Sequence, residues 1–139
     1  MTLQQKLSLL NACEDSLEWV GDMELHEAWA TCERGDWMLW LAKKAWVDLC
    51  TLTAAQAACA EFARPWMTDP SSIAALDAAH AFGRGEITEL QLDAAAAAYD
   101  TSYAYDAAYA ATYAAKRADV LKKCADEVRR IIPVELINF

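Results

Sequence analysis

The chain has 139 residues, a length typical of one domain, and a formal net charge of −9. A negative charge of this size disfavours nonspecific binding to nucleic acids, whose backbone is also negative. Hydrophobic residues make up 56% of the chain, whereas only four glycines and three prolines are present, too few for a turn-rich β protein. We therefore expect a single all-α domain over residues 1–139, built from about six or seven helices.

The N-terminal part of the chain predicts two short helices and a link. Thr2 is a suitable N-cap for a first helix, and Asp22 is a suitable N-cap for a helix over residues 23–33. Residues 13–22 end in the helix breaker Gly21 and the cap Asp22, and we expect these ten residues to form an irregular link.

The tripeptide Arg34-Gly35-Asp36 marks a change from one helix to the next. Glycine suits the left-handed conformation that ends many helices, so a positive φ is expected at Gly35. Asp36 suits the N-cap of a following helix over residues 37–48. Although this tripeptide is also an adhesion motif, a helix-to-helix corner accounts for it fully.

Two helices of the middle part are bounded by caps and breakers: one begins at Thr51 or Thr53 and ends before Pro65, and one begins at Asp69 or Ser71 and ends near Gly83. Thr88 then caps a last region over residues 89–132 that contains no glycine or proline. A continuous helix of that length would measure roughly 65 Å, more than such a domain spans. We expect a bend or break near residues 100–103.

The alanine- and tyrosine-rich part of this last region predicts a central helix or a seam between copies of the chain, because alanine lies on nearly all of its sides. One face carries polar residues among apolar ones, and a carboxylate there must be paired, hydrogen-bonded or solvated. The face therefore predicts a possible polar cleft formed by Asp106, Tyr109, Tyr113 and Arg117.

The five cysteines neither pair by number nor show the CxxC spacing of a zinc site. Free thiols in a reducing cytoplasm are the expectation. No signal peptide pattern begins the chain, and aspartates interrupt the alanine-rich stretch, so no membrane span is predicted. The cysteines are Cys13, Cys32, Cys50, Cys59 and Cys124.

The sequence contains no recognisable catalytic motif. His26 and His80 are the only histidines, and neither belongs to a zinc-protease pattern or a Ser-His-Asp arrangement. No glycine-rich phosphate loop is present. We expect a protein without enzymatic activity, cofactor or metal. A cluster of tryptophans is expected in the core rather than in a ligand cage, and comprises Trp29, Trp37, Trp40 and Trp46.

Several segments resemble a family of immunity proteins, called Imm-five-like, found in bacterial genomes and in phages. The most specific is segment 32–42 (CERGDWMLWLA), which resembles the hallmark of that family. The others are segments 17–22, 57–60, 64–65, 81–85, 118–121 and 124–133. The resemblance covers most of residues 13–133 and implies an α-helical protein that neutralises a toxin by binding it.

The expected function is therefore that of a cytoplasmic protein that neutralises a toxin or defence protein by direct contact. The alternatives are a phage-encoded counter-defence inhibitor, an acidic DNA mimic, or a catalytic domain built around Asp106. Residues 1–40 contain eight acidic and two basic side chains, an excess of six negative charges. Such a surface steers a protein towards a basic partner. The expected contact residues are Glu14, Asp15, Glu18, Asp22, Glu24 and Glu27.

Overall fold

A computed structural model describes the backbone of residues 1–100 and 104–139, and the side chains of residues 1–65, 67–95 and 118–139. Over this range the protein is all-α, as predicted, with no strand. The elements are α1 (Leu3–Leu9), α2 (Glu14–Val20), α3 (Leu25–Thr31), α4 (Gly35–Lys44), α5 (Leu49–Ala60), the 3₁₀ helix η1 (Glu61–Trp66), α6 (Pro70–Gly83), α7 (Glu89–Asp100), α8 (Ala104–Ile131) and the 3₁₀ turn η2 (Val134–Leu136).

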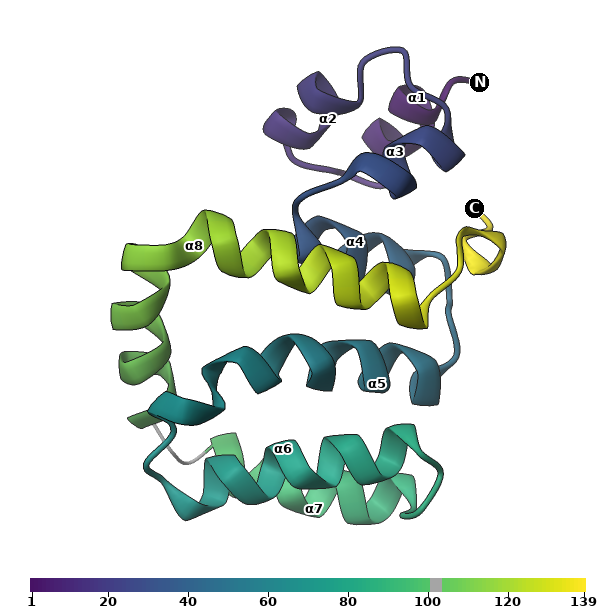
Figure 1. Ribbon diagram of the computed structural model, residues 1–139. Coiled ribbons are helices and arrows are strands. Elements are labelled where there is room, and N and C mark those ends of the chain that lie inside the picture. Colours follow the sequence, from purple (N-terminus) through teal and green to yellow (C-terminus); the bar gives the residue numbers. More distant parts are fainter. Residues whose placement is uncertain (101–103) are drawn as a thin grey trace.

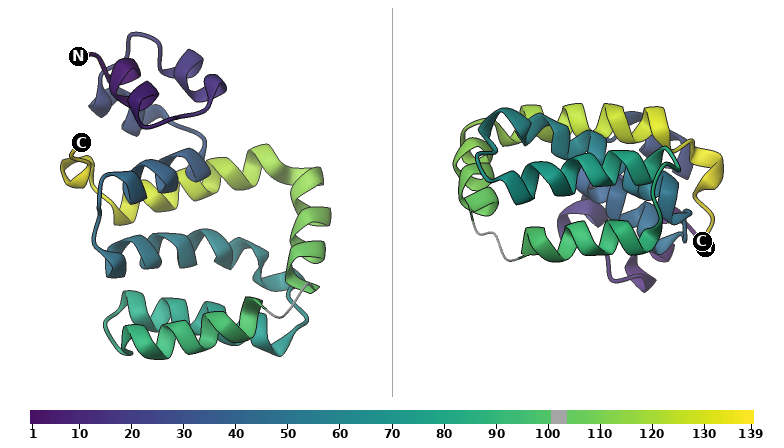
Figure 2. Two further views of the ribbon diagram at one scale, coloured as in Figure 1. Left: turned by 180° about the vertical axis from the view of Figure 1, so that it is seen from behind. Right: turned by 90° about the horizontal axis from the view of Figure 1, so that it is seen from below.

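The helices stack along one direction (Figure 1). The three short helices α1–α3 form one end of the molecule, and the antiparallel pair α6 and α7 forms the other. Helix α8 packs against both α4 and α5, and α5 packs in turn against α6. The last long helix is therefore a central element, and the C-terminal segment returns to the side of the molecule that carries the N-terminus (Figure 2).

Three helix starts agree with the caps that the sequence predicts, whereas the predicted cap Asp22 is wrong because Glu24 holds the N-cap position of α3. The Thr2 hydroxyl accepts a hydrogen bond from the Gln5 N–H, while the Gln5 side chain accepts one from the Thr2 N–H, which completes a capping box. Asp69 caps α6, and Thr88 caps α7. Helix α5 begins earlier than expected, because the Asp48 carboxylate rather than a threonine accepts the N–H of Thr51.

The expected link over residues 13–22 is wrong, since most of it forms helix α2. Ser16 and Val20 are buried there, while the charged side chains of α2 face solvent, a helical pattern spread over only two turns. Gly21 then ends α2 with a φ of 47°. This additional helix is one reason why eight α-helices are found over the described residues, rather than six or seven.

The predicted positive φ of Gly35 is also wrong. Gly35 is the first residue of α4 and is not among the residues with positive φ. It is buried because α4 and α8 approach each other closely there: a Cβ added to Gly35 would lie 2.5 Å from the Cβ of Cys124 and 2.8 Å from the N of Ala125. Asp36 lies in the first turn of α4 instead of capping it.

Three helices end in the same hydrogen-bonded cap, with a left-handed residue just past the end. In the cap of α4 the N–H of Trp46 donates to the Lys43 carbonyl and the N–H of Val47 to the Ala42 carbonyl. The left-handed residues are Asn11 after α1 (φ 63°), Trp46 after α4 (φ 59°) and Gly85 after α6 (φ 75°).

The core lies where α4, α5 and α8 meet, and small residues let these helices approach. Ala42, Ala55 and Ala125, one from each helix, are fully buried, as are Val128 and Ile132. Most side chains of the alanine- and tyrosine-rich part, for which a central helix or a seam between copies was expected, lie outside the described residues. The predicted break occurs, because α7 ends at Asp100 and α8 begins at Ala104. No helix in the described part of the chain is long and apolar enough to span a membrane.

Candidate protein-binding surface

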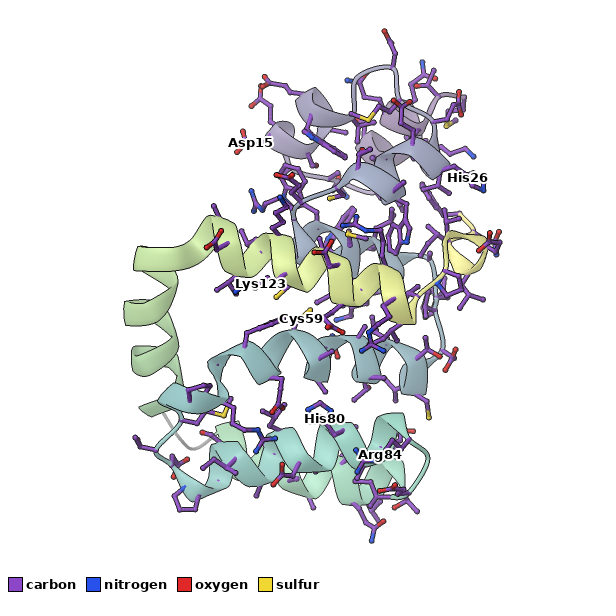
Figure 3. All side chains as sticks on the ribbon, viewed as in Figure 1. Asp15, His26, Cys59, His80, Arg84 and Lys123 are labelled. Atoms are coloured by element: carbon purple, nitrogen blue, oxygen red, sulfur yellow. The ribbon has the colours of Figure 1, made fainter. Side chains whose placement is uncertain are left out.

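All six predicted contact residues are exposed, and together they define the acidic surface: Glu14, Asp15, Glu18, Asp22, Glu24 and Glu27. Three lie on α2, two in the connection between α2 and α3, and one on α3. Asp15 points away from α2 into solvent (Figure 3). The helical period of α2 exposes its acidic side chains. Its buried residues, Ser16 and Val20, are four positions apart and so lie on one face, and the acidic residues lie on the other.

The other two acidic residues of the first forty have partners. Asp36 accepts two hydrogen bonds from the Arg34 guanidinium, at 2.9 Å and 2.7 Å. Burial opposes the charge of Asp36, but the hydrogen bonds and charge of Arg34 outweigh it and hold the pKa of this carboxyl below its ordinary value. Glu33 lies 3.7 Å from the ammonium of Lys122. No such ion pair joins the acidic surface to a cation of the described residues.

Local stability explains only part of the acidic surface. Glu14 and Asp15 lie in the first turn of α2 and Glu27 in the first turn of α3, where negative charge is favoured by the helix dipole. Glu18 lies in the second half of α2, and Asp22 lies outside any helix. Glu24 occupies the N-cap position of α3, but its side chain accepts no capping hydrogen bond. Half of the surface therefore has no local role.

Two arginines near the end of α8 are engaged within the fold. The Arg129 guanidinium donates to the carbonyls of Trp29 and Cys32, both at 2.8 Å, and so satisfies backbone acceptors at the end of α3. Its Nη2 also pairs with Asp126. Arg130 pairs with Glu127. The link from Arg129 to α3 joins residues about a hundred positions apart, and no local pattern in the sequence predicts it.

An apolar cavity of about 340 Å³ lies between α1–α3 and α4. Four tryptophans line it, including Trp19 and Trp37, whose ring centroids are 6.1 Å apart. Asp36 is the only charged residue in its lining. The α2 residues that face the cavity are Ser16, Trp19 and Val20, on the opposite face of that helix from its acidic side chains. The cavity is thus separate from the acidic surface.

The predicted tryptophan core is confirmed for three of its four members. Trp29 is buried and donates its indole N–H to the Ile132 carbonyl at 3.1 Å, while Trp37 and Trp40 pack against the core. Trp46 is different, because 90% of its surface is exposed. The helix expected over residues 37–48 would have included Trp46, but α4 ends at Lys44.

A polar cluster joins η1 to α6. The Glu61 carboxylate accepts a hydrogen bond from Arg64 at 2.6 Å and lies 2.7 Å from the Nε2 of His80, and Arg64 also contacts Asp77 at 2.8 Å. The hydrogen bond from Arg64 is the main reason why the pKa of Glu61 is lowered. Each of these groups has a partner within the cluster, so the cluster is sufficiently explained by holding η1 on α6. His26 is exposed on α3 (Figure 3).

The five cysteines are free. Cys13 and Cys50 are exposed, Cys32 and Cys124 are buried, and burial raises the pKa of Cys32. Cys59 of α5 faces α8, and its Sγ lies 3.7 Å from the Cys124 carbonyl oxygen (Figure 3).

The side chains of the predicted polar cleft, Asp106, Tyr109, Tyr113 and Arg117, lie outside the described residues.

Comparison of the chain with protein-family models, curated proteins and solved structures gives no match. The surface is therefore interpreted from its own geometry. Among the described residues, no three His, Cys, Asp or Glu side chains converge as a metal site would require.

Proposed function

We propose that this protein is a non-catalytic binding protein that neutralises a toxin or a defence protein by direct contact through the acidic surface. One observation carries the proposal: of eight acidic residues among the first forty, Glu33 and Asp36 have cation partners, and the other six, which pair with no cation among the described side chains, are all exposed. Unpaired exposed charges of one sign attract a surface of the opposite sign and speed its association.

The partner that fits is a protein with a basic surface. The charges come from α2, α3 and the connection between them, at one end of the molecule. Hydrogen bonds from Arg129 to the Trp29 carbonyl and from the Trp29 indole to the Ile132 carbonyl hold α3 in place. A surface held in this way meets a partner without first having to become ordered, which lowers the entropic cost of binding. The same charges would repel nucleic acids.

The experiment begins with purification of the tagged protein from the organism that encodes it and identification of bound proteins by mass spectrometry. Affinity for the isolated partner is then measured for the triple variant Glu14→Lys, Asp15→Lys, Glu18→Lys. A matched control reverses three exposed carboxylates elsewhere, Asp93, Asp119 and Glu135, so that both variants change the net charge equally.

The proposal predicts a dissociation constant at least about tenfold higher for the first variant and little changed for the control. Equal effects of the two triple variants would show that only overall charge matters, and would remove the acidic surface as the contact site. Neutralisation itself is tested by co-expression: the first variant should fail to protect cells from the identified partner, while the control should protect them. Unmodified protein that gives no protection would contradict the neutralising function.

A further inference from the structure

Trp46 combines a left-handed backbone with an exposed indole. It follows the end of α4 with a φ of 59°, and 90% of its surface is exposed. The cap that it forms normally contains glycine, because a side chain is strained in this conformation. For a bulky aromatic residue such a φ is a genuine outlier.

The cap does not require the indole. The apolar contact that accompanies a cap of this kind is made by the following residue, and here Val47 packs against the core. The two equivalent positions, Asn11 and Gly85, hold residues that tolerate the left-handed conformation. The backbone at Trp46 is therefore strained, and burial of the side chain does not offset this strain. Strained positions of this kind tend to be retained for function.

Two exposed lysines lie in the last turn of α4, just before Trp46 in sequence. Neither Lys43 nor Lys44 forms an ion pair with a carboxylate in the described part of the chain, and the Lys44 ammonium lies 5.8 Å from the centre of the Trp40 ring. The nearest acidic residue in sequence, Asp48, accepts hydrogen bonds from the N–H and the hydroxyl of Thr51 and so caps α5. Leu49, 44% exposed, follows at the start of α5. The turn thus presents an aromatic ring, a second apolar side chain and two positive charges.

We propose that this turn is a second docking site, at which the Trp46 indole inserts into an apolar pocket edged by carboxylates on a partner protein. Tryptophan is the residue that most often anchors protein interfaces, because it buries a large rigid surface when it enters a pocket. Lys43 and Lys44 supply the charge complementarity that selects an acidic rim. The site differs from the acidic surface in both position and charge, and it does not rest on the function proposed above.

An anionic membrane fits the turn less well than a protein. The chain carries a net charge of −9, which an anionic surface repels. Stable attachment to a bilayer also takes a larger buried apolar face than one tryptophan and a neighbouring leucine provide.

The first test measures stability. Trp46→Gly should raise the melting temperature of the isolated protein, because glycine adopts the left-handed conformation without strain. Asn11→Gly is the matched control at the equivalent cap of α1, and it should change the melting temperature little because asparagine already tolerates this conformation. A lower melting temperature for Trp46→Gly would mean that the indole stabilises the fold, and would overturn the proposal.

The second test measures contact. A photoreactive benzoylphenylalanine is placed at position 46 in the full chain and, as a control, at position 90, where Leu90 is 78% exposed on α7. After irradiation in the organism that encodes the chain, a protein should be crosslinked from position 46 and not from position 90. The crosslinked peptide should map to an apolar pocket with aspartate or glutamate at its edge.

With that protein purified, Trp46→Gly should raise the dissociation constant at least about tenfold even though it stabilises the fold. The pair Lys43→Glu and Lys44→Glu should raise it as well, most at low salt. The proposal is overturned by the absence of an adduct, by an adduct only with a second copy of this chain, or by an unchanged dissociation constant. It is also overturned if wild-type protein, but not Trp46→Gly, sediments with phosphatidylglycerol vesicles while no protein adduct forms.

Discussion

Replacing Gly35 by alanine tests the close contact between α4 and α8. The added methyl group has two opposite effects on stability: it favours the helix, and it overpacks the contact. In an ordinary helix, glycine to alanine raises stability by about 0.5–1 kcal/mol. Here the new Cβ would lie 2.5 Å from the Cys124 Cβ and 2.8 Å from two backbone atoms of α8, the C of Cys124 and the N of Ala125. Carbon atoms pack at about 3.5–4.0 Å, so the helices must separate by about 1 Å.

Overpacking of a core costs about 1–3 kcal/mol, and the upper end applies because the clash involves backbone atoms that no rotamer change can move. Subtracting the gain in helix propensity leaves a net loss of about 2 kcal/mol. In a domain of this size that loss lowers the melting temperature by about 6 °C, measurable by circular dichroism. The control is Gly85→Ala, where nothing lies within 4 Å and only the positive φ is costly, so a smaller loss is expected. A Gly35→Ala protein as stable as wild type would refute the close approach of the two helices.

Three further predictions concern groups inside the fold. Thiol titration of the native protein should show two fast-reacting cysteines, Cys13 and Cys50, and five in denaturant without reductant, whereas fewer than five would reveal a disulfide. Trp29→Phe should lower the free energy of unfolding by about 2 kcal/mol in urea titrations, because a buried carbonyl loses its donor; an unchanged midpoint would contradict this bond. The pKa of Asp36 is lowered in the folded state, so its contribution to stability should be present at neutral pH and lost as the pH falls below about 4. The gap in melting temperature between wild type and Asp36→Asn should therefore narrow from pH 7 to pH 3, and a constant gap would count against the pair.

Features of the fold that depend on residues close together in the chain could be predicted from the sequence. Thr2, Asp69 and Thr88 cap the helices that they were expected to cap, because a capping side chain bonds a backbone group only three residues away. The exposure of the acidic surface was also predictable, since charged side chains seldom lose their water without a partner. The break after Asp100 followed from length alone.

The features that depend on distant residues were not predictable. Glycine is typical of a helix end, but the role of Gly35 is to let α8 approach α4. Its sequence neighbours do not indicate that Cys124 and Ala125 lie beside it. Arg129 in α8 donates to the carbonyls of Trp29 and Cys32, about a hundred positions away in sequence. Trp46 was expected in the core with the other tryptophans, but α4 ends before it. Gly35 and Arg129 owe their roles to packing between distant segments, which local preferences do not reveal.

The most direct test of the central claim is the salt dependence of the association rate with the partner identified by purification. Rates are measured by stopped-flow between about 20 and 500 mM salt for wild type and for Glu14→Lys, Asp15→Lys, Glu18→Lys. Binding through the acidic surface predicts a wild-type rate that falls steeply as salt increases, and a variant that is at least about tenfold slower at low salt with a flat or reversed slope. Identical slopes for the two proteins would contradict the account, because the unpaired carboxylates of α2 would then take no part in recognition.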